Sequence, residues 1–130
     1  PLDREIAGFF TFRPGQPDYV DGPTRNDQWG WLENYPQHGY VASKGVDGKV
    51  SYEQVTVGVS QNTSPDRKGH CGAFNVKDSQ GRSFSVRNGF DPRPDGYLYG
   101  WNFSEQWDRA YELDPELVFV TGWNEYTAGM

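Results

Sequence analysis

Trp123, Asn124 and Glu125 stand side by side in the stretch "FVTGWNEY" (119–126). The stretch begins as a run of apolar β-formers, so three polar or aromatic side chains follow directly on a predicted strand. An amide can hold a hydroxyl group, an indole can stack on a sugar ring, and a carboxylate can move a proton or attack an anomeric carbon. The trio therefore indicates a sugar site, while a loop-bracing Glu beside a core Trp is the structural alternative.

Three strands and one helix would position this trio. Apolar and β-branched patterns predict strands at 5–12, 52–60 and 117–123. The sequence "SEQWDRAYEL" predicts a helix at 104–113 with Ser104 as its N-cap. In parallel α/β folds, ligand sites form at the carboxyl ends of the strands, which is where Glu125 falls.

The order strand, loop, helix, strand favours a parallel sheet, because the helix and the last strand are joined by only about three residues. A (β/α)8 barrel takes about 250 residues, so three strands cannot close one. We therefore expect residues 1–130 to form a single unit that belongs to a larger barrel or packs against a partner. Alternation on both sides of "KDSQGRS" (77–83) predicts a β-hairpin insertion within a long loop.

The composition excludes several classes of function. The chain has 12 basic and 18 acidic residues and no basic run, so we expect no nucleic-acid partner. No apolar stretch approaches about 18 residues, so we expect no membrane span. His70 and Cys71 are adjacent without a second pair at zinc spacing, and no glycine-rich phosphate loop occurs, so we expect neither a metal nor a cofactor. Aromatic residues make up 16% of the chain, which suits a ligand with flat faces.

The segment "SEQWDRAYELDPELVFVTGWNEY" (104–126) resembles the last catalytic strand of glycoside hydrolases of families 71 and 99 and their relatives. In those enzymes a strand ends in W-N-E/D-[WY] at the mouth of a (β/α)8 barrel. The resemblance covers residues 101–126. It implies that this chain is a C-terminal segment of an α/β TIM barrel with long βα loops, with Glu125 as a catalytic carboxylate and Trp123 and Asn124 as its neighbours.

Glycoside hydrolysis usually needs a second carboxylate, and none follows Glu125 in the positions where those families often place one. Glu33 is the main candidate, because its aromatic neighbours in "WGWLENYP" would raise its pKa as a general acid requires. Asp91, in "FDPRPDG", could bound the pocket or could be a turn residue. Asn62 follows its strand as Glu125 follows the last one, so it could bind a hydroxyl group. The candidate stacking platforms are Trp29, Trp31, Trp101 and Trp123.

The function that these residues predict is hydrolysis of a poly- or oligosaccharide, at an extracellular or periplasmic location. Two alternatives stay open. A non-catalytic carbohydrate-binding module would have the same aromatic residues and would not need a second acid. A structural domain with a chance W-N-E sequence would bind no sugar near Glu125.

Overall fold

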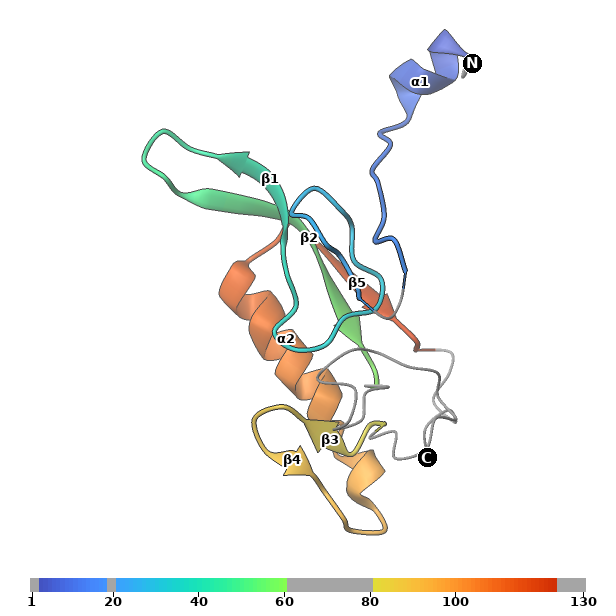
Figure 1. The fold of residues 1–130 in the computed structure, drawn as a ribbon, viewed down its shortest axis with the longest axis vertical. Helices are drawn as coiled ribbons and strands as arrows, with labels where there is room; N and C mark the ends of the chain where they lie inside the picture. Colours follow the sequence, from blue (N-terminus) through green and yellow to red (C-terminus); the bar gives the residue numbers. More distant parts are fainter. Residues whose placement is uncertain (1–2, 19–20, 61–80, 124–130) are drawn as a thin grey trace.

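The computed structural model describes residues 3–18, 21–60 and 81–123 (Figure 1). Its elements, in chain order, are α1 (Arg4–Phe9), β1 (Tyr40–Lys44), β2 (Val50–Gly58), β3 (Phe84–Ser85), β4 (Gly89–Phe90), the 3-10 helix η2 (Gly96–Leu98), α2 (Trp101–Leu113) and β5 (Leu117–Thr121).

The main sheet has three strands in the order β1-β2-β5. β2 and β5 run parallel, with Val55 opposite Val118 and Val57 opposite Val120, and α2 lies between them in the chain. The predicted parallel pairing of the second and last strands is thus confirmed. β1, however, runs antiparallel to β2 and occupies its other edge.

The predicted barrel segment is wrong. A (β/α)8 barrel is all-parallel and is built from about 250 residues, whereas the described residues of this 130-residue chain form a mixed three-stranded sheet and a separate two-stranded one. The prediction missed β1 because Tyr40 and Val41 end an aromatic segment that reads as a loop, and the rest of the strand, Ala42 to Lys44, is small and polar. A tight turn brings β1 back along β2: the Gly45 amide donates to the Lys49 carbonyl at 2.8 Å, and Gly48 adopts a φ of 80° that favours glycine.

The predicted strand at 5–12 is also wrong at its start, which forms the short helix α1. The Asp3 side chain caps this helix by accepting a hydrogen bond from the Glu5 amide at 2.8 Å. None of the helical residues is buried, and Figure 1 shows α1 projecting away from the sheet. The prediction rested on apolar and aromatic residues, whose preference for strands depends on packing against a neighbouring strand, and no such neighbour adjoins this segment among the described residues.

Helix α2 begins three residues before the predicted start. Its N-cap is Gly100, at a left-handed φ of 60°, and the Ser104 amide donates to the Gly100 carbonyl at 2.8 Å. Ser104 therefore lies inside the first turn and does not cap the helix. The short pair β3–β4 joins Phe84 to Phe90 and Ser85 to Gly89. Phe84, on the second arm of the predicted hairpin, pairs here with β4, while the first arm lies outside the described residues, so the hairpin stays a prediction.

The two faces of β2 are covered differently. On one face, Val55 and Val57 are fully buried against Ala110 of α2, and Phe103 and Trp107 pack around them. On the other face, the polar loop of residues 14–39 lies against Gln54 and Thr56, which are equally buried (Figure 1).

Hydrogen bonds hold that loop to the sheet and to α2. The Gln54 side chain pairs with both backbone groups of Gly30, accepting at 3.2 Å and donating at 2.9 Å. The Gln37 side chain donates to the carbonyls of Thr56 and Gln106, at 2.9 and 3.1 Å. Buried amide groups must find partners, so these contacts fix the path of the loop.

Candidate functional site

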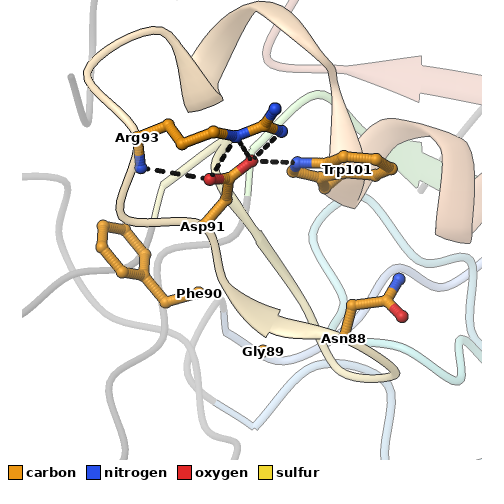
Figure 2. Close-up of a pocket in the computed structure, with 6 residues that line it drawn as sticks. All are labelled: Asn88, Gly89, Phe90, Asp91, Arg93 and Trp101. Carbon is orange, nitrogen blue, oxygen red and sulfur yellow. Dashed lines mark hydrogen bonds and ion pairs between the residues drawn. The ribbon is translucent and has the colours of Figure 1, made fainter.

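A pocket of about 460 Å³ lies between β4 and the start of α2, and we call it the Trp101 pocket. Its volume is within the usual range of small-ligand sites, roughly 300–1,000 Å³. It is lined by Asn88, Gly89, Phe90, Asp91, Arg93 and Trp101. Figure 2 shows these side chains on one short segment of chain and on the first turn of α2.

The Asp91 carboxylate is the centre of the pocket's polar network. It accepts hydrogen bonds from the Arg93 guanidinium at 2.6 to 3.1 Å, from the Arg93 amide at 3.1 Å and from the Trp101 indole at 2.8 Å (Figure 2). Arg93 and then Trp101 hold the pKa of Asp91 well below its usual range, and Asp91 in turn raises the pKa of Arg93. Asp91 is therefore a charged, fully engaged carboxylate and is unsuited to act as a general acid.

Two aromatic rings, Phe90 and Trp101, line the pocket, and Tyr99 packs behind Trp101. Trp101 stacks on Tyr99 at 5.7 Å with an interplanar angle of 12°, and the Arg93 guanidinium lies 4.2 Å from the centre of the Tyr99 ring. Phe90 is 56% exposed at the rim. The opposite charges of Asp91 and Arg93 cancel, so the pocket offers flat apolar surface around a neutral ion pair.

A second pocket, of about 530 Å³, is lined by Thr11, Arg13, Trp29, Glu53 and Glu116, and we call it the Trp29 pocket. Here Glu53 accepts from Arg13 at 2.7 and 2.8 Å and from the Trp29 indole at 2.9 Å. Arg13, together with the Trp29 indole, lowers the pKa of Glu53. The two pockets repeat one arrangement, an Arg–carboxylate pair that also accepts from an indole.

Glu33 lies inside the 14–39 loop and not on an open pocket. Its side chain is 7% exposed, and one oxygen accepts from the His38 amide at 3.0 Å and lies 2.9 Å from the His38 ring nitrogen Nδ1. A Cβ atom at Gly30 would come within 1.8 Å of the other oxygen, so any side chain there would displace the Glu33 carboxylate. This position favours a loop-bracing role for Glu33 over its predicted role as a general acid.

The remaining predicted site residues do not gather at one place. Trp101 and Trp29 line different pockets, while Trp31 and Trp123 are 41% and 65% exposed and line neither. Asn62, Asn124 and Glu125 lie outside the described residues, so their predicted roles stay predictions.

Sequence reasoning missed Arg93, Phe90 and Asn88. The signal was present in "NGFDPRPDG" (88–96), where an acid and an arginine two residues apart flank a proline. Prolines and glycines made the segment read as a turn, and only the position of Trp101, ten residues from Asp91, turns it into a pocket.

No protein-family model matches this chain, and no curated protein or solved structure gives a significant match. The resemblance to glycoside hydrolases of families 71 and 99 therefore remains a prediction. Within the described ranges, no helix is long and apolar enough to cross a membrane.

Proposed function

We propose that the chain binds a neutral carbohydrate, with the Trp101 pocket receiving a sugar ring. The observation that supports this most directly is the combination of the Trp101–Tyr99 stack with an Asp91–Arg93 pair that is already neutralised. Sugar rings present an apolar face and a rim of hydroxyl groups, so they fit an aromatic surface bordered by fixed polar atoms.

The hydroxyl groups of the sugar would be bound by side chains that have hydrogen-bond donors or acceptors still available. The Asn88 side chain is exposed and makes no hydrogen bond within the described part of the chain, so its amide can donate to and accept from a hydroxyl group. The Asp91–Arg93 pair offers no net charge to an anionic sugar, and the chain's net charge of -6 opposes one. Neutral hexoses suit the site better than uronates.

Binding without catalysis suits this pocket, because its single carboxylate is fully engaged. Hydrolysis is the second candidate function. Two carboxylates, Glu53 and Glu116, line the Trp29 pocket, and glycoside cleavage usually uses two. Glu53 is paired with Arg13, which lowers its pKa, so Glu53 would serve as nucleophile or base and Glu116 as the acid. The predicted catalytic residue Glu125 would be a further carboxylate.

Titration of the purified chain with a panel of neutral oligosaccharides, followed by calorimetry, tests the proposal. Trp101→Ala should weaken binding about tenfold or more, because the loss of a stacked ring costs on the order of 1.5–3 kcal/mol. Asn88→Ala should weaken it several-fold. Trp31→Ala removes an exposed indole outside both pockets and should leave affinity unchanged. Equal affinity of the Trp101 and Trp31 variants, or no binding across the panel, would contradict the proposal.

Release of reducing sugar from the same panel tests hydrolysis. Glu125→Gln, Glu53→Gln and Glu116→Gln should each lower turnover by orders of magnitude if that residue is catalytic, while leaving binding at the Trp101 pocket intact. Turnover that none of the three changes, or no turnover at all, leaves binding as the function.

A further inference from the structure

The Arg93 side chain has a hydrogen-bond donor that the Asp91 carboxylate does not use. Its Nε and Nη2 atoms donate to Asp91 at 2.6 to 3.1 Å, whereas Nη1 makes no hydrogen bond within the described part of the chain. The side chain is 50% exposed and lines the Trp101 pocket. A molecule bound in the pocket can therefore accept a hydrogen bond from Nη1.

The Asp91 carboxylate, in contrast, has no acceptor left to offer. Oδ1 accepts from the Arg93 amide and from Nε, and Oδ2 accepts from Nε, from Nη2 and from the Trp101 indole. These bonds occupy the roughly four lone-pair sites of a carboxylate. The ion pair thus presents a donor to the pocket and no free acceptor.

The indole and the guanidinium lie next to each other because they share one oxygen. Asp91 Oδ2 accepts from the Trp101 indole at 2.8 Å and from Arg93 Nη2 at 2.6 Å (Figure 2). A sugar ring stacked on the indole would therefore place one of its substituents beside the guanidinium. Phe90, an exposed ring that also lines the pocket, lies across Asp91 from Trp101 in Figure 2.

We propose that this substituent is an acetamido group, so that the Trp101 pocket prefers an N-acetylamino sugar; the inference rests on the proposed binding of a neutral carbohydrate. The acetamido carbonyl oxygen only accepts hydrogen bonds, which matches the free donor of Arg93. The acetamido methyl group is apolar and gains from covering part of the Phe90 ring. The Asn88 amide stays available for a ring hydroxyl group.

The charges of the site favour this group over the other acceptors that Arg93 could bind. A carboxylate or sulfate would also accept from Nη1, but Asp91 already balances the charge of Arg93, and the chain carries a net charge of -6. A hydroxyl group could use Nη1 but would leave the Phe90 ring uncovered. A free amino group would bring a second cation beside the guanidinium. The acetamido group is neutral and uses both the donor and the ring.

Calorimetric titration with four oligosaccharides of the same length and linkage tests the proposal. They are an N-acetylated sugar, its hydroxyl counterpart, its free-amine counterpart and a uronate. The N-acetylated sugar should bind roughly five- to tenfold more tightly than the hydroxyl sugar, because it adds a covered methyl group and an oriented hydrogen bond to a charged donor. The amine and the uronate should bind more weakly than the N-acetylated sugar.

Two variants locate the preference in the pocket. Phe90→Ala removes the surface for the methyl group and should bring the preference to about twofold or less, while leaving the affinity for the hydroxyl sugar nearly unchanged. Arg93→Lys keeps the charge beside Asp91 but removes Nη1, so it should weaken the N-acetylated sugar more than the hydroxyl sugar. Phe90 is 56% exposed, so its truncation should leave the fold intact, which circular dichroism checks.

Each variant has a matched control. Leu98 is a 70% exposed apolar side chain that does not line the pocket, so Leu98→Ala should leave the preference unchanged. Arg25 pairs with Asp27, an acid two residues away as in the pocket, but lies elsewhere, so Arg25→Lys should also have no effect.

The outcomes separate this inference from the proposed function. Equal affinity of the unchanged chain for the N-acetylated and hydroxyl sugars would overturn the acetamido preference and leave carbohydrate binding supported. Tightest binding of the amine or the uronate would overturn it as well, because charge would then select the ligand. A preference that neither Phe90→Ala nor Arg93→Lys reduces would also overturn it. Binding of none of the sugars would contradict the proposed function itself.

Discussion

The two faces of β2 are buried to the same degree by different means. Toward α2, Val55 and Val57 meet apolar side chains and need only shape and volume. Toward the 14–39 loop, the Gln54 side chain meets the backbone of Gly30 and the Thr56 carbonyl accepts from the Gln37 side chain, and each contact depends on the direction of a hydrogen bond. Apolar packing tolerates substitution of similar volume, whereas a buried polar contact that loses one partner leaves the other unsatisfied.

Of the substitutions that test the two faces, Gln54→Leu should have the largest effect on the free energy of unfolding. The substitution keeps the volume but leaves both the amide and the carbonyl of Gly30 without their side-chain partner in a buried place. We expect the free energy of unfolding to fall by about 3 kcal/mol, the sum of two unsatisfied groups at ~1–3 kcal/mol each. Chemical denaturation measures it. A loss below that of Val57→Ala would mean that the polar face contributes less than the apolar one.

Val57→Ala on the opposite face should cost somewhat less. Two methyl groups are removed from a fully buried side chain, with a small cavity left against α2. The expected loss is about 2 kcal/mol, from ~0.8 kcal/mol per methyl-sized group plus the cavity. Val57→Ile is the small-to-large control: its effect on the free energy of unfolding should show whether that face has space for one more methyl group.

The polar loop should also make stability depend on pH. Burial tends to lower the pKa of His38, but the hydrogen bond and charge of Glu33, with the Gln28 carbonyl, outweigh it and raise the pKa above its usual value. A raised folded-state pKa contributes stability below the unfolded value of about 6.5, and this contribution is lost as pH rises through the folded value. Denaturation between pH 5 and 8 should show that fall, and His38→Gln should flatten it. If stability falls with pH as steeply in the His38→Gln variant as in the unchanged chain, a group other than His38 causes the pH dependence.

The smallest effect should come from the exposed side of α2. Arg109 and Glu112 form an ion pair at 3.1 Å one turn apart, with the Glu112 side chain 51% exposed. Glu112 also lies 3.6 Å from the Arg87 guanidinium. Exposed pairs of this kind contribute about 0.2–0.5 kcal/mol each, so Glu112→Gln should change stability by no more than about 1 kcal/mol and should lose the effect at high salt. A larger loss would show that the outer face of α2 also contributes to the fold.

Periodicity was sufficient to predict the apolar face. The alternation of Val55, Val57 and Val59 and the stripe around Ala110 predicted the second strand, the helix and the last strand, because each pattern is local and repeats with the period of its element. Where the observed ends of these three elements differ from the predicted ends, they differ by two or three residues. The parallel pairing followed from the short connection between α2 and β5.

The polar face and the Trp101 pocket were beyond the reach of local patterns. Gln54 and Gln37 look like surface residues in the sequence, and only contact with a distant backbone makes their burial favourable. The Trp101 indole donates a hydrogen bond to the Asp91 carboxylate at 2.8 Å only because η2 and the start of α2 place the two residues side by side.

By itself, the sequence determined which residues could form the apolar layer and which aromatic and acidic residues are candidates for the proposed site, because those properties belong to single side chains and short periods. The tertiary structure decided the rest. It placed β1 antiparallel and so excluded the barrel, formed a helix at Arg4–Phe9 that buries none of its residues, and engaged Glu33 within the loop and Asp91 beside an arginine. These outcomes depend on contacts between segments far apart in the chain, and no local pattern contains them.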